Sequence, residues 1–385
     1  MACDARKVYS GRGKGIRVAA GTAVGKWLRR HWTLVLLVSI PVAALLEFLA
    51  PERQTAIFVA TTVAIVPLAA YIGRATDALA NRLGGGIGGL LNATFGNAAE
   101  LIIGALALRR GLTDLVKASL TGSIIGNVLL VFGLCAIVGG VKRSVLKFNR
   151  TAAGMAATML VLSAIGLTVP AVFHQLSRGR PDASELTLDT EIAVVLFLTY
   201  CASLLFMLKT HRGLYDGRKE DGPPAGGKSA WPSVALLISA TAGVAWMSEL
   251  LVGSVAEAAP SLGMSNLFVG VVVVAIIGNA AEHFSAVLMA ARNQMDAAIG
   301  IAVGSSTQIA LFVAPVLVFL SYAIAPRPMD LRFTVFEVVA VGLAVITISL
   351  IAQDGETHWM EGVQLLAVYI ILVLGFYFLA VPATT

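Results

Sequence analysis

The amino-acid sequence predicts an all-α, polytopic membrane protein, and three observations support that fold class. Of the 385 residues, 57% are hydrophobic and only 13% are charged, and the mean hydropathy of +0.84 is far above that of a soluble domain. The apolar residues gather in stretches of about 20, the length that a helix needs to cross the bilayer core. One pentapeptide recurs inside two of these stretches, which indicates an internal duplication.

Eleven apolar stretches are candidates for membrane-crossing helices. The first half of the chain contains 33–49, 56–73, 87–108, 115–138, 152–173 and 190–208. The second half contains 234–251, 267–290, 297–320, 333–351 and 363–380. The first stretch is short enough for a signal-peptide core, but no small-residue cleavage pattern follows it, so we interpret it as an anchor.

The stretches divide the chain into four parts. Residues 1–55 are a basic N-terminal leader with the first helix, and 56–208 form a first set of five helices. Residues 209–232 contain a polar run rich in charge, Gly and Pro that cannot bury a core, so we interpret them as a flexible cytoplasmic linker. Residues 233–385 form a second set of five helices.

The basic residues predict how the chain is oriented. If the N-terminus is cytoplasmic, the leader and the even-numbered loops carry 20 of the 28 Lys and Arg residues, and the opposite side carries 8. The positive-inside rule therefore places the N-terminus inside and, after eleven crossings, the C-terminus outside. Because the basic residues lie between apolar stretches, they predict loop anchoring rather than binding of nucleic acid.

The two pentapeptides indicate how the two sets of helices are related. Residues 96–100 and 278–282 both read Gly-Asn-Ala-Ala-Glu and lie 182 residues apart. At the same offset, Gly-Ser at 122–123 recurs at 304–305 in the next helix of each set. Because five is odd, the second set enters the membrane the other way up. The sequence thus predicts two inverted-topology repeats, which many secondary transporters use.

Glu100 and Glu282 end the two pentapeptides and form the candidate functional centre. A carboxylate near the middle of a membrane helix costs roughly 2.5–3.5 kcal/mol on insertion scales, so it is rarely kept without a use. Two of them repel each other, so the empty dianion is unfavourable, and either one Ca²⁺ or protons would relieve it. Competition for one site with two alternating gates gives antiport. The alternative is a mutually satisfied structural pair.

Neighbouring oxygen atoms are predicted to complete a cation site. Asn97 and Asn279 precede the glutamates by three residues and would ligate a cation, orient a carboxylate or join helices by hydrogen bonds. Gly96 and Gly278 would let another backbone approach closely. The following helices add Ser123, Asn127, Ser305 and Gln308. Such a set matches Ca²⁺, which takes 6–8 oxygen ligands, and the lack of thiolates argues against zinc or copper.

Five further residues are candidates for proton coupling or for the access path. His283 is offset by about 100° from Glu282 around the helix, so it would tune proton coupling or simply pack between helices. Glu249 and Glu337 lie in apolar helices and would line an ion path, snorkel to the interface or make a structural hydrogen bond. Asp77 and Glu257 follow the first helix of each repeat and are either gate-mouth acids or solvated loop acids.

The motifs carry a family resemblance. The two Gly-Asn-Ala-Ala-Glu copies, with Gly-Ser-Ile-Ile-Gly-Asn at 122–127 and Gly-Ser-Ser-Thr-Gln at 304–308, resemble the Ca²⁺/H⁺ exchanger branch of the calcium/cation antiporter superfamily. The resemblance covers helices 2 to 11. Sequences of the Na⁺/Ca²⁺ exchanger branch typically have Thr-Ser-x-Pro-Glu instead, which this chain lacks.

The resemblance implies roles for particular residues. Glu100 and Glu282 would be the central Ca²⁺ and proton ligands, and His283 fits the family pattern. The residues around the pair would be Asn97, Asn279, Ser123 and Gln308. One departure is Asp77, which ends Arg-Ala-Thr-Asp where Thr-Glu is expected. This shorter acid affects an access-path position but leaves the central pair intact.

The sequence therefore predicts a secondary active transporter of the cell (inner) membrane that exchanges cytosolic Ca²⁺ for protons. Ca²⁺ is the transported substrate, and no cofactor is implied. A Na⁺(K⁺)/H⁺ or Mn²⁺/H⁺ antiporter, a Na⁺-coupled Ca²⁺ exchanger and a cation channel are the alternatives. An enzyme is disfavoured because the chain has no His-Glu-x-x-His, Gly-x-Ser-x-Gly or phosphate-binding loop motif. The oligomeric state stays open between a monomer and a homo-oligomer.

Overall fold

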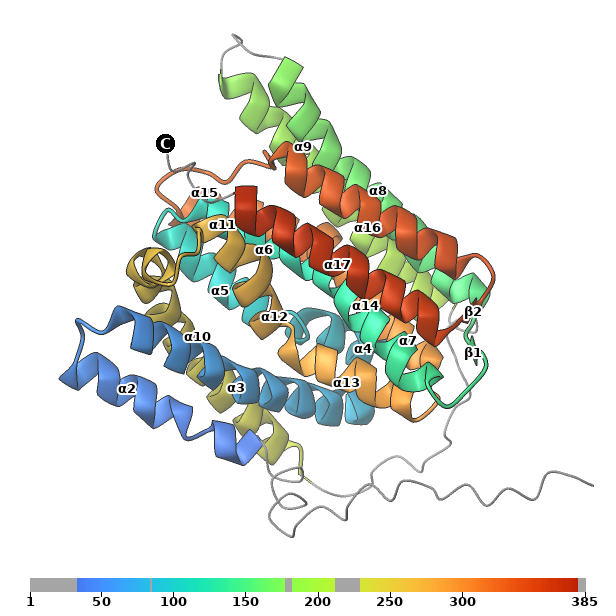
Figure 1. The fold of residues 1–385 in the computed structure, drawn as a ribbon, viewed down its shortest axis with the longest axis horizontal. Helices are drawn as coiled ribbons and strands as arrows, with labels where there is room; N and C mark the ends of the chain where they lie inside the picture. Colours follow the sequence, from blue (N-terminus) through green and yellow to red (C-terminus); the bar gives the residue numbers. More distant parts are fainter. Residues whose placement is uncertain (1–32, 84, 177–181, 212–228, 380–385) are drawn as a thin grey trace, which may run out of the picture.

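A computed structural model of the chain describes residues 33–83, 85–176, 182–211 and 229–379. Over these ranges the chain is a bundle of helices, as Figure 1 shows. Eight of the helices in the described part are long and apolar enough to cross a membrane, and a bent helix pair forms a ninth candidate span. The predicted fold class, an all-α polytopic membrane protein, is confirmed.

The elements follow in two runs. The first run is α2 (Ser39–Leu49), α3 (Gln54–Leu83), α4 (Gly85–Phe95), α5 (Ala98–Arg109), α6 (Thr113–Ile125), η1 (Gly126–Val131), α7 (Phe132–Gly140), β1 (Leu146–Lys147), α8 (Arg150–Leu176), α9 (Asp182–Leu205) and η2 (Phe206–Thr210). The second run is α10 (Trp231–Ser261), α11 (Asn266–Phe268), η4 (Val269–Val274), α12 (Ala275–Gly278), α13 (Ala280–Ala291), α14 (Met295–Gln308), η5 (Ile309–Val313), α15 (Ala314–Ile324), α16 (Val335–Ala352), β2 (Glu356–Thr357) and α17 (Trp359–Leu379). The η segments are single π-helical turns.

The prediction of eleven crossings is not confirmed, because two predicted helices are broken at the pentapeptides. The helix predicted over 87–108 is divided into α4 and α5, and the one over 267–290 bends by 60° between 266–278 and 280–291. Asn97 and Asn279 sit at the breaks with nearly the same backbone angles, φ −100° and ψ 19° against φ −91° and ψ 7°. The first apolar helix, Thr33–Leu49, is also shorter than a standard span.

Two helix ends that were predicted from the sequence are wrong. The prediction ended the first helix of each repeat at residues 73 and 251, but α3 continues to Leu83 and α10 to Ser261. Asp77 and Glu257 therefore lie inside these helices and not after them. No Pro follows Gly73 within α3, and a single Gly is tolerated inside a helix at a cost of about 1 kcal/mol.

Contacts between loops sort the ends of the helices into two faces. On one face, β1 pairs antiparallel with β2, and the backbone N–H of Asn149 donates to Asp296 at the start of α14. Because α9 ends and α10 begins on this side, we call it the linker face. On the opposite face, Thr55 at the start of α3 shares a hydrogen bond of 2.7 Å with Ser261 at the end of α10. Among the described loops, those after the fourth, eighth and tenth predicted helices thus share one face, and those after the first and seventh share the other.

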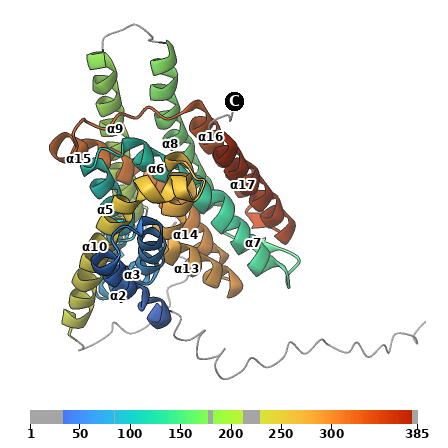
Figure 2. The ribbon, with the colours of Figure 1, turned by 60° about the vertical axis from the view of Figure 1, so that its left-hand side comes forward.

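The two repeats interlock through their helices. Figures 1 and 2 show α2, α3 and α10 together along one side of the bundle, with α16 and α17 on another side and α5, α6, α13 and α14 between them. In the middle layer α6 crosses η4 so closely that a methyl group on Gly122 would overlap the backbone of Val271. Gly270 likewise leaves room for Ala118. Close crossings through glycine are typical of membrane helices, where shape complementarity replaces the hydrophobic effect.

The leader (residues 1–32) and most of the linker (residues 212–228) lie outside the described residues, as do 177–181 and 380–385. The described ends of the predicted linker belong to η2 and α10.

Candidate cation site

Glu100 and Glu282 occupy the first turns of α5 and α13, directly after the two helix breaks. The first N–H groups of a helix have no partner within the helix, and its N-terminus carries a partial positive charge that favours anions. The broken helices also end at Phe95 and Gly278, which frees their last carbonyl groups from the helical pattern. The breaks therefore bring carboxylates, N–H groups and carbonyl oxygens to the middle of the bundle. This is the construction by which transporters form ion sites.

Each carboxylate packs against the glycine that begins the pentapeptide of the other repeat. A methyl group on Gly278 would lie 3.2 Å from Oε1 of Glu100, and one on Gly96 would lie 3.3 Å from Oε1 of Glu282. The arrangement is reciprocal, as expected for two copies related by a two-fold axis. It also gives both glycines a physical role, because a side chain at either position would press on a carboxylate.

Both glutamates keep one buried oxygen without a hydrogen-bond partner. Oε2 of Glu100 and Oε2 of Glu282 are inaccessible to solvent and accept no hydrogen bond from any residue in the described part of the chain. Leaving a buried carboxylate oxygen unpaired costs several kcal/mol, so such atoms mark a place where a cation or a proton belongs. Within the described ranges no three His, Cys, Asp or Glu residues gather.

The second pentapeptide is embedded in a hydrogen-bond network that crosses between repeats. Nδ2 of Asn279 donates to Oγ of Ser123 at 2.9 Å, and Oδ1 of Asn279 accepts from Asn127 at 3.3 Å. Asn127 also donates to Oγ of Ser305 at 3.2 Å, and its Oδ1 lies 2.9 Å from Nε2 of His283. His283 is thus joined to the site through Asn127 and is not placed as a direct ligand.

The first pentapeptide has a simpler partner. Nδ2 of Asn97 donates to Oε1 of Gln308 at 2.6 Å, so the asparagine of one repeat is again held by a residue of the other. Gln308 is the last residue of α14, and the π-helical turn η5 begins directly after it. On the corresponding helix of the first repeat, η1 contains Asn127. Single π turns occur often at functional sites because they re-aim side chains out of the regular helix.

A cavity of about 470 Å³ reaches Glu282 from one side. It is lined by Asp77 of α3, Asn92 of α4 and Glu282, with Ser305 and Gln308 of α14. Because Asp77 lies near the end of α3, and the first turn of α14 also borders the cavity, it extends from the glutamate toward the linker face. Asp77, a predicted gate-mouth acid, thus lines the same cavity as Glu282.

The other acidic candidates lie away from this cavity. Glu249 on α10 makes ion pairs with Arg109 at 3.0 Å and Arg110 at 2.6 Å, both at the opposite-face end of α5. Glu337 is buried at the start of α16, where it accepts from the backbone N–H of Thr334. Glu257 borders a separate groove at the opposite face. None of these three acids lines the cavity at Glu282.

Two features of the structure, one in the site and one away from it, have only a weak signal in the sequence. Asn92 lines the cavity and lies one helical turn before Gly96, whose N–H donates to the Asn92 carbonyl at 2.8 Å. The only sequence signal for Asn92 is its amide side chain, four residues before the repeated pentapeptide. The ion pairs of Arg109 and Arg110 with Glu249 join residues 139 or 140 positions apart, and no sequence spacing predicts such a pair.

A helical bundle with a carboxylate pair at two matched helix breaks defines a membrane carrier of cations. Comparison with known proteins makes the assignment specific. The profile of the family described as "Sodium/calcium exchanger protein" matches residues 53–209 and 232–378, more than half of the chain. The chain belongs to this family. It is a transporter and not an enzyme, and the resemblance seen in the pentapeptides is confirmed.

The relatives are similar over nearly their whole length. A Ca²⁺/H⁺ antiporter of Synechocystis sp. is 44% identical over 361 residues, which cover 90% of this chain and 96% of the relative. The Ca²⁺/H⁺ antiporter ChaA of Bacillus subtilis is 47% identical over 330 residues, which cover 84% and 92%. The solved structure of native YfkE superimposes with a TM-score of 0.78 at 42% identity, covering 90% of this chain and 99% of that one.

Proposed function

We propose that this protein exchanges cytosolic Ca²⁺ for protons across the membrane and that Glu100 and Glu282 bind the two ions alternately. The observation that carries the proposal is the reciprocal packing of the carboxylates, each of which keeps a buried oxygen without a partner. Two relatives that match most of the chain at 44% and 47% identity are named Ca²⁺/H⁺ antiporters, which supports the choice of ions over the Na⁺, K⁺ and Mn²⁺ alternatives.

The site has the chemistry for exchange. One Ca²⁺ neutralises both carboxylates and takes further oxygens from the surrounding residues, whereas protons neutralise the carboxylates without needing those oxygens. The two kinds of ion exclude each other because they use the same carboxylate oxygens. Acidity on the side from which Ca²⁺ binds therefore weakens Ca²⁺ binding, and acidity on the other side promotes Ca²⁺ release.

The proposed ligand set extends beyond the glutamates. The further proposed ligands are amides and hydroxyls that are joined to one another by hydrogen bonds between the repeats: Asn97, Asn279, Ser123, Asn127, Ser305 and Gln308. Gly96 and Gly278 make room for the carboxylates. His283 positions Asn127, and Asp77 guides cations through the cavity.

We also propose the domain organisation of two inverted repeats, 56–208 and 233–385, joined by a cytoplasmic linker at 209–232. The 182-residue offset supports it beyond the pentapeptides. Gly111, after α5, has φ +74°, and Asn293, after α13, has φ +65°. These two residues are also 182 positions apart, and each ends its helix in the left-handed conformation.

The linker face is assigned to the cytoplasm because the predicted basic loops lie on it. The N-terminus is then inside and the C-terminus outside. Because the cavity at Glu282 extends toward that face, the structure corresponds to the state that faces the cytosol. We propose that the tight crossing of α6 with η4 closes the site from the opposite face.

The test is proton movement in everted membrane vesicles that hold an acidic interior, with Ca²⁺, Mn²⁺, Na⁺ and K⁺ added separately. Ca²⁺ should dissipate the pH gradient in vesicles with the unaltered protein. Glu100→Gln and Glu282→Gln should each abolish this response, a loss of about 100-fold or more, because one carboxylate cannot neutralise a divalent cation.

Expression and melting temperature of both variants serve as the control for folding. Flux like that of the unaltered protein in either variant would refute the proposed site. Ca²⁺ flux that follows a Na⁺ gradient, without proton movement, would keep the site and replace the coupling ion.

A further inference from the structure

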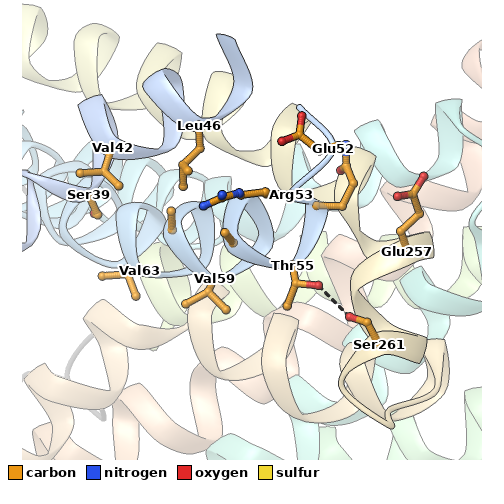
Figure 3. Close-up of a pocket in the computed structure, with 13 residues that line it drawn as sticks. Ser39, Val42, Leu46, Glu52, Arg53, Thr55, Val59, Val63, Glu257 and Ser261 are labelled. Atoms are coloured by element: carbon orange, nitrogen blue, oxygen red, sulfur yellow. Dashed lines mark hydrogen bonds between the residues drawn. The ribbon is translucent and has the colours of Figure 1, made fainter. Parts of the chain in front are cut away.

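A groove outside the cation site runs between α2 and the first helices of the two repeats. It has a volume of about 940 Å³ and begins at the opposite face, where α3 starts and α10 ends. Figure 3 shows its wall of aliphatic side chains, with Val42 and Leu46 from α2 and Val59 and Val63 from α3. Neither carboxylate of the cation site borders it.

The length of the groove matches one leaflet of a bilayer. Its lining on α3 extends from Arg53, just before the helix, to Val63. Ten residues at a rise of 1.5 Å per residue span about 15 Å, half of the roughly 30 Å hydrocarbon core. A groove that begins at the membrane surface, has aliphatic walls and ends at mid-bilayer has the dimensions of an acyl chain.

The rim of the groove carries charges of both signs. Arg53, Glu52 and Glu257 border it, and none of them makes an ion pair with another residue in the described ranges. Figure 3 shows the Arg53 side chain lying along the groove beside Leu46, while the carboxylates of Glu52 and Glu257 lie toward the start of α3. The positive and negative groups are thus separated along the rim.

A hydrogen bond of 2.7 Å between the side chains of Thr55 and Ser261 joins α3 to α10 at this end of the groove. A molecule in the groove would contact the first helices of both repeats and α2 at once.

We propose that this groove binds a phospholipid whose headgroup carries a primary ammonium, the phosphatidylethanolamine class. The acyl chain lies along the aliphatic wall, the phosphate accepts hydrogen bonds from the Arg53 guanidinium, and the ammonium donates to Glu52 and Glu257. Two carboxylates beside one guanidinium disfavour an anionic headgroup. A choline headgroup is disfavoured because its quaternary nitrogen has no N–H to donate.

The test is native mass spectrometry of the full chain, released from detergent with equal amounts of phosphatidylethanolamine, phosphatidylcholine and phosphatidylglycerol. Phosphatidylethanolamine should be retained about tenfold over each of the others, the ratio expected for one charge-assisted hydrogen bond. Glu257→Gln should remove this preference, whereas Arg53→Gln should lower the retention of all three lipids, because the phosphate is common to them. Arg327→Gln is the matched control, since Arg327 is an exposed arginine on the same face and outside the groove.

A thermal-shift measurement gives a second readout that does not depend on transport. Phosphatidylethanolamine should raise the melting temperature of the unaltered protein and of Arg327→Gln but not that of Arg53→Gln. Equal retention of the three lipids, a preference that survives Glu257→Gln, or unchanged retention of all three lipids by Arg53→Gln would overturn the proposal. Disulfide-linked dimers formed by Leu46→Cys in phosphatidylethanolamine vesicles would also overturn it, by assigning the groove to a second copy of the chain.

Discussion

Gly122 and Gly304 hold the same position in the two repeats, 182 residues apart, yet their surroundings differ. On the first repeat's helix α6, a methyl group at Gly122 would overlap the backbone of Val271 in η4. On α14, nothing lies within 4 Å of the corresponding position at Gly304. Of these two equivalent glycines, Gly122 therefore forms a tight helix crossing, whereas Gly304 faces open space.

This difference is what two inverted repeats with alternating gates would produce. The tight crossing joins α6 to the first part of the bent helix of the second repeat, and the open counterpart at Gly304 lines a separate cavity between α8, α9 and α14. At the 182-residue offset, the counterpart of Val271 is Gly89 in α4. In the alternate state we expect Gly304 to pack against α4 as Gly122 now packs against η4.

Charged residues add a second difference between the faces. At the opposite face, Arg109 and Arg110 both pair with Glu249 and tie α5 to α10. At the 182-residue offset, Arg110 corresponds to Arg292, which makes no ion pair within the part of the chain that the structure describes. The opposite face thus has an ionic clamp between α5 and α10, and no such contact forms at Arg292 among the described residues. The ion pair on the linker face, Lys147 with Glu356 at 2.9 Å, joins β1 to β2 instead.

The largest effect in this comparison is expected from Gly122→Ala. The added methyl group cannot fit against the Val271 backbone, and overpacking of this kind costs about 1–3 kcal/mol or more. The melting temperature of the purified protein should fall by several degrees. Transport should fall to the extent that less folded protein remains. Unchanged stability would mean that the α6–η4 crossing is looser than the structure shows.

Gly304→Ala should separate stability from transport. The position has open space in this state, so the change in the free energy of unfolding should stay within about 0.5 kcal/mol. Turnover should fall about tenfold or more, because the methyl group opposes closure of the linker face by about 1–3 kcal/mol. The measurement is Ca²⁺-dependent proton release, alongside a melting curve.

The matched control for that substitution is Gly300→Ala. Gly300 also has nothing within 4 Å, and its counterpart at the 182-residue offset is already alanine, Ala118. Both states should therefore accept it with little change in turnover. If Gly300→Ala and Gly304→Ala slow transport equally, the predicted closure against α4 is wrong.

A smaller effect is expected from Glu249→Gln, which weakens the ionic clamp. The carboxylate is about one-third exposed, so solvent screening limits the lost interaction to about 1 kcal/mol, or roughly a fivefold shift toward the outward-facing state. The apparent affinity for Ca²⁺ on the cytosolic side should fall to a similar or lesser extent. Ca²⁺ titrations of proton release in everted vesicles measure it.

A double-mutant cycle with Arg110→Gln tests whether the effect arises from the ion pair. If it does, the double variant should be no worse than the single variants. Glu47→Gln serves as the charge control, because Glu47 is an exposed carboxylate on α2. Additive effects of the two substitutions would show that the clamp does not hold the opposite face closed.

The central pair illustrates what can be predicted from sequence. Glu100 and Glu282 could be paired in advance because repetition at a fixed offset implies a symmetry axis, and that axis brings equivalent residues together. The helix breaks beside them were not predicted, because Gly-Asn-Ala-Ala-Glu is apolar enough to continue a hydropathy stretch. Only backbone geometry shows that Asn97 and Asn279 leave the helical conformation.

Asp77 and Glu249 illustrate what could not be predicted from the sequence. Both are single acids near apolar helix segments, and their sequence contexts allowed similar interpretations for each. The structure puts Asp77 in the cavity that leads to Glu282 and puts Glu249 in ion pairs with two arginines. A side chain's partner across a helix crossing depends on the rotation and depth of both helices, and a linear pattern does not encode either.

The sequence by itself determined the membrane fold class and indicated the duplicated organisation and the two candidate carboxylates, because hydropathy and repetition are properties of the linear chain. The tertiary structure decided where the helices break, which oxygens meet at the pair and which face of the protein is closed. These depend on contacts between residues more than 100 positions apart, such as Asn97 with Gln308 and Gly122 with Val271. Such contacts arise only when the two repeats pack against each other in one of their two states.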